Sequence, residues 1–203
     1  MRSNRSYKKG EPFRDSRLFV IACEGAAREK AYFERLRPNS PRLRFEVISP
    51  QMQENDNVGN SSPKWVLDRV VKFIEKEGVN IENGDRIWFV LDVDRWRKAL
   101  YDIQAECEKQ RWQVALSNPC FEVWLWLHIK EMAESQSITC QDFKAEINKN
   151  FAGGYKVEVF TKPEFYKSAL AKAKALDTAS GFMPDLKTSK VYLLLEELFE
   201  ILK

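Results

Sequence analysis

The sequence predicts an α/β fold built on a mostly parallel sheet, and three features carry this prediction. Short apolar runs at 18–22 and 87–91 each end in acidic or turn residues, as buried parallel strands do. Helical patterns separate these runs along the chain. After about residue 118 only helical patterns remain. We therefore expect a four-stranded sheet followed by a helical C-terminal extension.

Apolar runs and a proline mark the first elements. Residues 18–23 form the expected first strand, and a helix is expected at 27–37. Pro38 closes that helix because its ring cannot continue the helical hydrogen bonds. Apolar and charged side chains alternate over 45–48, which indicates a second, short strand.

The next elements have clear ends. Pro63 suits the first turn of a helix and Gly78 its end, so we expect a helix at 63–78. A turn at 83–85 then leads into the third strand. The elements that follow the turn are a strand at 86–91, a helix at 96–110 and a strand at 113–116. This strict alternation predicts right-handed parallel crossovers.

Helical patterns fill the rest of the chain. The expected helices lie at 119–133, 139–150, 163–177 and 189–202. We accordingly divide the chain into a basic N-terminal arm at 1–17, an α/β core at 18–135 and a helical extension at 136–203 packed on that core.

Composition limits the kinds of protein that this chain can be. Its 203 residues are 44% apolar and 31% charged, which suits a globular protein with one sizeable core. No apolar run approaches the roughly 18–20 residues of a membrane span. The N-terminus lacks the apolar stretch of a secretory signal. We expect a cytoplasmic protein with no membrane partner.

The cysteines and the single histidine narrow the chemistry. The four cysteines form no C-x-x-C pair, so the usual zinc spacing is absent from the sequence. The one histidine, His128, ends an apolar helical run, where a hydrogen-bonded structural role and a general-base role are both open. We therefore expect carboxylates to carry the chemistry.

The basic character of the chain is concentrated in its arm. The net charge is +3, but residues 1–17 carry six basic and two acidic residues, so the remainder is slightly acidic. Such an arm suits contact with nucleic-acid phosphates, and a solubilising leader is the alternative.

Two acidic clusters follow the strands at 18–23 and 86–91. Glu24 comes directly after the first of these strands, and Asp92 and Asp94 come after the second. Parallel strands end at one edge of a sheet, where ligands of open α/β sheets bind. Because Mg²⁺ prefers oxygen ligands, we expect these three residues to hold Mg²⁺, with Mn²⁺ as a substitute, and to be catalytic.

The sequence allows two interpretations of several residues in and near the acidic clusters. Asp92 and Asp94 could instead cap the helix near residue 96. Glu122 follows a strand-to-helix junction and is a candidate fourth metal ligand, yet Asn118 as N-cap with Glu122 as capping-box partner would explain both residues. Two acids of the polar loop at 49–62 could also approach the metal.

Four residues near the acidic clusters are expected to contact the substrate: Arg28, Arg95, Arg97 and Asn118. Arginine binds phosphate through paired hydrogen bonds. These cations would equally neutralise the carboxylates when no metal is bound, and Asn118 could orient Glu122.

Three motifs in order resemble the RloB-like family. They are the CEG sequence at 23–25 with Glu29 and a Tyr-Phe pair at 32–33, the VLDVD sequence at 90–94, and the SNPCFEVWL sequence at 117–125. Fainter matches occur at Tyr155 and Glu158 and at Thr188 and Val191, so the resemblance covers nearly the whole chain. Arg28 is a departure, because the family motif has threonine there.

The resemblance implies a Toprim-like, Rossmann-like domain that cleaves DNA or RNA with Mg²⁺. It also implies anti-phage defence by abortive infection, together with an RloA-like ATPase partner. The chain itself contains no G-x-x-x-x-G-K-[ST] loop, so a partner would supply ATP hydrolysis. Oligomerisation is compatible with this reading.

Two other functions remain open from the sequence. One is a non-catalytic subunit that binds nucleic acid or a nucleotide at the acidic edge, which the Arg28 departure favours. The other is a structural partner of an ATPase that uses the tryptophan-rich helix at 119–133 as its interface.

Overall fold

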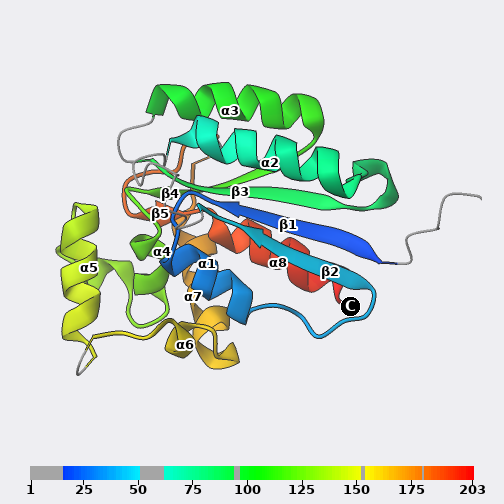
Figure 1. The fold of residues 1–203 in the computed structure, drawn as a ribbon. Helices are drawn as coiled ribbons and strands as arrows, with labels where there is room; N and C mark the ends of the chain where they lie inside the picture. Colours follow the sequence, from blue (N-terminus) through cyan, green and yellow to red (C-terminus); the bar gives the residue numbers. More distant parts are fainter. Residues whose placement is uncertain (1–15, 51–61, 94–96, 152–153, 180) are drawn as a thin grey trace, which may run out of the picture.

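A central sheet flanked by helices on both faces forms the body of the protein (Figure 1). The computed structural model describes residues 16–50, 62–93, 97–151, 154–179 and 181–203. The sheet order is β2-β1-β3-β4-β5, and the pairs β1–β2, β1–β3 and β3–β4 are parallel. The strands are β1 (Arg17–Cys23), β2 (Leu43–Ile48), β3 (Arg86–Asp92), β4 (Gln113–Asn118) and β5 (Thr188–Ser189). The predicted α/β class with a mostly parallel sheet is confirmed.

The structure adds a fifth strand that has no signal in the sequence. β5 has two residues and pairs antiparallel with β4, through Ser117 opposite Ser189 and Asn118 opposite Thr188. Two residues are too few to display the alternation that identifies a strand. The hydroxyl groups of Ser117 and Ser189 lie 2.8 Å apart and are buried. β5 thus joins the C-terminal third directly to the sheet.

Helices cover the two faces unequally. α2 and α3 lie on one face, and the remaining helices lie on the other (Figure 1). The α-helices are α1 (Arg28–Arg35), α2 (Pro63–Glu77), α3 (Arg97–Gln110), α4 (Glu122–Leu127), α5 (Cys140–Lys149), α6 (Val157–Phe160), α7 (Pro163–Leu176) and α8 (Val191–Ile201). Short 3₁₀ helices occur at Ile81–Asn83 and Met132–Glu134.

The alternation of side chains along the strands builds two cores. In β1, Phe19 and Ile21 face the core beneath α1, α4 and α8, whereas Val20 and Ala22 face the core beneath α2 and α3. Both sets are fully buried. This explains why the parallel strands read as continuous apolar runs.

The helix predicted at 119–133 is shorter than the apolar pattern suggested. α4 ends at Leu127, and the indole N–H of Trp126 then donates to the Glu131 carbonyl at 3.1 Å as the chain turns. All six residues of α4 are buried. The tryptophans of α4 therefore belong to the core, and the interpretation of this helix as a partner interface is wrong.

No helix among the described residues combines the length and apolar character needed to cross a membrane.

Candidate functional site

The topology places a switch point at the carboxyl ends of β1 and β3. The chain runs from β1 outward to β2 and then returns to the other side of β1 as β3, so the strand order reverses between these neighbours. Ligands of open α/β sheets bind at such a switch point, beyond the carboxyl ends of the strands. Glu24 directly follows β1, and Asp92 is the last residue of β3. The two carboxylates thus flank the expected binding position.

Hydrogen bonds join these two strand ends. The Glu24 N–H donates to the Val90 carbonyl at 3.1 Å, which continues the ladder between β1 and β3 past the end of β1. The Glu24 carboxylate then accepts the N–H of Asp92 at 3.1 Å. Glu24 is 9% exposed, so the contact is shielded from water. The structure therefore brings Glu24 and Asp92 together across the switch point.

Asp92 also reaches the segment that leads into α4. Its Oδ1 accepts the N–H of Phe121 at 2.9 Å, next to Glu122. β3 and β4 are neighbours in the sheet, with Asp92 opposite Ser117, so the start of α4 lies above the end of β3. Glu122 is 4% exposed and joins the same edge. Of the other expected acids, Asp94 and the two acids of the loop at 49–62 lie outside the described residues.

Glu29 is a further acid that the sequence analysis did not assign to the site. It lies in the first turn of α1 and packs against Gly25, where an added Cβ would clash with the Glu29 carboxylate. The charge of Glu29 raises the pKa of Asp92, and the charge of Glu122 raises the pKa of Glu29. The available signal was its position five residues after Glu24, in the helix that begins just beyond the strand end.

The acids at this edge oppose each other's ionisation. Loss of water contact raises the pKa of Asp92 well above its usual range, and the charges of Glu29, Glu24 and Glu122 raise it further. Burial is also the main cause that raises the pKa of Glu29, with Glu122 adding to it. Like charges gathered in a poorly hydrated place favour a bound cation, which would relieve their repulsion.

Glu122 is paired with basic side chains on its other side. Arg28 Nη1 donates to Glu122 Oε1 at 2.6 Å, and Lys144 Nζ lies 3.8 Å from the same oxygen. The Arg28 guanidinium also lies over the ring of Tyr155, 5.5 Å from its centroid. The sequence left open whether Arg28 binds a substrate phosphate or neutralises a carboxylate. In this structure Arg28 neutralises the Glu122 carboxylate.

Asn118 holds a loop and does not orient Glu122. Its Nδ2 donates to the Pro184 carbonyl at 2.9 Å, and its carbonyl accepts the N–H of Lys187 at 2.7 Å. α4 begins at Glu122 with Phe121 as N-cap and no side-chain cap. The capping-box interpretation of Asn118 and Glu122 is therefore wrong. Of the other expected substrate residues, Arg97 begins α3 and Arg95 lies outside the described residues.

His128 is part of the core beneath the site. Its Nδ1–H donates to the Trp124 carbonyl at 2.8 Å, and its Nε2 lies 3.0 Å from the Tyr32 hydroxyl and accepts from it. Burial lowers the pKa of His128 to about 3. A ring that is neutral and bonded at both nitrogens has a structural role.

The acidic edge suits a sparsely ligated divalent cation. Within the described ranges, no group of three or more Asp, Glu, His or Cys side chains is arranged to hold a metal ion. Mg²⁺ does not require such a cage, because it keeps several waters and takes one or two carboxylates with substrate phosphates. Glu24 and Asp92 could supply those carboxylates.

Comparison with known protein families identifies the family of this chain. The family described as RloB-like protein matches residues 19–198, which cover β2 to β5, most of β1, and the four acids Glu24, Glu29, Asp92 and Glu122. Neither the curated proteins nor the solved structures contain a match to this chain.

Proposed function

Because the chain belongs to the RloB-like family, we propose that it is a metal-dependent nuclease that hydrolyses phosphodiester bonds of DNA or RNA. The observation that carries this proposal is the meeting of Glu24 and Asp92 at the switch point of the sheet. Carboxylates at this position face a ligand that lies across the strand ends.

Glu24 and Asp92 would hold Mg²⁺ or Mn²⁺, together with Asp94 from the segment after β3. The ion, when bound, polarises a phosphoryl oxygen and lowers the pKa of bound water. The N–H of Asp92 fixes the Glu24 carboxylate, and the N–H of Phe121 fixes that of Asp92. Both acids are thereby oriented before a substrate arrives, which reduces the reorganisation that catalysis needs.

Glu29 and Glu122 complete the electrostatic setting of this site. Their charges add to the attraction for a cation at Asp92. The ion pair between Arg28 and Glu122 neutralises part of that negative charge. When a substrate binds, the Arg28 guanidinium would leave Glu122 and bind a substrate phosphate instead. A threonine at position 28, as in the family motif, would leave Glu122 without this partner.

The proposal extends to the cellular setting. A nuclease of this family would act in anti-phage defence, by abortive infection, together with an RloA-like ATPase. The sequence contains no P-loop of its own, which supports a separate source of ATP hydrolysis. The alternative function is a non-catalytic subunit that binds nucleic acid or a nucleotide, and the ion pair that occupies Glu122 favours it.

Calorimetric titration of Mn²⁺ tests the proposal, with wild type compared with Asp92→Asn. The amide keeps an oxygen to accept the Phe121 N–H, so the fold is retained while a charge is lost. We expect saturable binding in the wild type and at least about tenfold weaker binding in the variant. Asp102→Asn, on the exposed side of α3, is the matched control and should bind as the wild type does.

Cleavage is then assayed with the ATPase partner present, on single-stranded and duplex DNA and RNA. Loss of cleavage in Asp92→Asn but not in Asp102→Asn supports the nuclease. Equal Mn²⁺ binding by all three proteins would overturn the metal site, and nucleic-acid binding without cleavage would establish the alternative subunit.

A further inference from the structure

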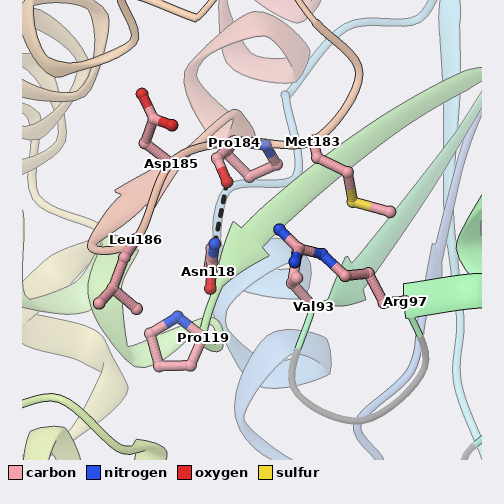
Figure 2. Close-up of a pocket in the computed structure, with 8 residues that line it drawn as sticks. All are labelled: Val93, Arg97, Asn118, Pro119, Met183, Pro184, Asp185 and Leu186. Carbon is pink, nitrogen blue, oxygen red and sulfur yellow. Dashed lines mark hydrogen bonds between the residues drawn. The ribbon is translucent and has the colours of Figure 1, made fainter.

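A hollow of about 470 Å³ opens beside the acidic edge (Figure 2). Val93, one residue after Asp92, lies on one side of it, and Asn118 and Pro119, which precede α4, lie on another. The loop at 183–186, between α7 and β5, closes the remaining side. The hollow therefore shares two strand ends with the proposed catalytic site, although none of the four acids lines it.

Arg97 is the basic side chain among the described residues that line this hollow. It is the first residue of α3, and its side chain extends across the opening toward Asn118 (Figure 2). Among the described residues, no acid forms an ion pair with Arg97. Asp185 lines the same hollow, but its carboxylate points away from the guanidinium (Figure 2). An exposed guanidinium beside a phosphodiester site is suited to a phosphate oxygen.

Several of the other residues that line the hollow have apolar side chains or are prolines. Met183 and Leu186 flank the opening, with Pro119 and Val93 at its base (Figure 2). Leu186 is 55% exposed, although an apolar side chain of this size gains by being covered. Asn118 holds the loop in place through the Pro184 carbonyl, so the hollow is preformed.

An aromatic pair stands next to the hollow. Tyr101 follows Arg97 by one turn of α3, and its ring centroid lies 5.8 Å from that of Phe182, which precedes the loop at 183–186. Tyr101 is 52% exposed. Exposed rings beside a cation form the platform on which proteins stack the bases of single strands. Residues i and i+4 share one face of a helix, so the cation and the ring lie on the same side.

We propose that this hollow is a nucleotide subsite that seats one unpaired nucleotide of a single-stranded nucleic acid next to the scissile bond. The base packs against Met183 and Leu186, its neighbour stacks on Tyr101, and the phosphate between them binds Arg97. The inference rests on the proposed nuclease function and names its substrate class. The volume suits a nucleotide, and a base paired within a duplex cannot enter such a pocket.

The test is fluorescence anisotropy of labelled hexanucleotides, one of DNA and one of RNA, with the full chain. Measurements in EDTA and in Ca²⁺ separate strand binding from cleavage. We expect Arg97→Glu to weaken binding at least tenfold and Tyr101→Ala to weaken it about fivefold or more. An acidic residue is favourable in the first turn of a helix, so Arg97→Glu should fold normally.

Lys98→Glu is the matched control, because it reverses a charge at the adjacent exposed position of α3. We expect it to change affinity less than threefold, and we expect a duplex of the same length to bind at least tenfold more weakly than either single strand. A preference between the DNA and RNA strands identifies the sugar that the subsite accepts.

Equal effects of Arg97→Glu and Lys98→Glu, no single-strand binding in either buffer, or equal binding of the duplex would overturn the subsite. These outcomes are independent of the nuclease proposal, which depends on Mn²⁺ binding and cleavage by Asp92. If Arg97 proves essential for binding while Asp92→Asn changes neither metal binding nor cleavage, the subsite proposal is supported and the nuclease proposal is overturned.

Discussion

Asp92 connects three strand ends through two hydrogen bonds. Its N–H donates to the Glu24 carboxylate beyond β1, and its own carboxylate accepts the Phe121 N–H beyond β4. A single substitution at this residue therefore acts on the whole edge. Asn at this position preserves the second hydrogen bond and removes the charge, which makes it the sharpest test of the site.

His128 provides a prediction about pH at the same scale. Its folded pKa is about 3, whereas an unfolded histidine has a pKa near 6.5. Below about pH 6.5 the unfolded chain binds a proton that the folded protein rejects, so stability falls as the pH falls toward 3. Urea unfolding of the wild type and of His128→Gln, which does not titrate, measures this loss.

We expect the free energy of unfolding of the wild type to fall by about 2 kcal/mol relative to His128→Gln between pH 6.5 and 4.5. The carboxylates titrate in both proteins, so their contribution cancels in the difference. A difference between the two proteins that stays constant over this interval would contradict a neutral, buried His128.

At the scale of elements, the turn from β1 into α1 decides where Glu29 lies. Gly25 leaves room for the Glu29 carboxylate to fold back over the turn toward Asp92. The sequence alone predicted the strand, the helix and the position of Glu24. It could not predict that the Glu29 side chain folds back toward Asp92, because the packing of α1 over the strand end sets the direction of that side chain.

Gly25→Ala tests this element. The new methyl group would clash with the Glu29 carboxylate, so the flexible Glu29 side chain must move away from the turn. We expect Mn²⁺ affinity to fall about tenfold, with a change in unfolding free energy below about 1 kcal/mol. Gly181→Ala, where nothing lies within 4 Å of the added atom, is the control.

Unchanged Mn²⁺ affinity in Gly25→Ala would remove Glu29 from the site. A large loss of stability in this variant, by contrast, would mean that the turn itself cannot accept a Cβ.

At the scale of the whole molecule, a buried network attaches the C-terminal helices to the sheet. Lys190 Nζ donates to both oxygens of Asp177, at 2.9 and 2.8 Å, and the Tyr192 hydroxyl donates to Asp177 at 2.9 Å. The Lys190 N–H donates to the Leu116 carbonyl of β4. The end of α7, the start of α8 and the sheet thus meet at one point, beside the loop that forms the proposed subsite.

Asp177→Asn should destabilise the whole protein. The Lys190 and Asp177 side chains are only 11% and 3% exposed, and removal of one charge leaves the other buried without compensation. We expect a loss of about 3 kcal/mol in urea unfolding followed by tryptophan fluorescence. The exposed pair of Lys174 and Glu196 also joins α7 to α8, and Glu196→Gln should cost less than about 1 kcal/mol.

Similar losses in the two variants would contradict a special role for the buried network. A separate early transition in Asp177→Asn would instead mean that the C-terminal helices unfold independently of the sheet, as two domains would. The boundary drawn from the sequence at residue 135 stays a prediction until that measurement is made.

Local sequence patterns were enough to predict the alternation of strands and helices and the position of Glu24 and Asp92 at strand ends. These features depend on local periodicity and on residues next to one another in the chain. The three-dimensional fold was needed to show that Arg28 pairs with Glu122, that β5 joins the sheet, and that the loop at 183–186 encloses a hollow with Arg97. These contacts join residues 70 to more than 90 positions apart, and such pairings arise from the packing of whole elements, which no local pattern encodes.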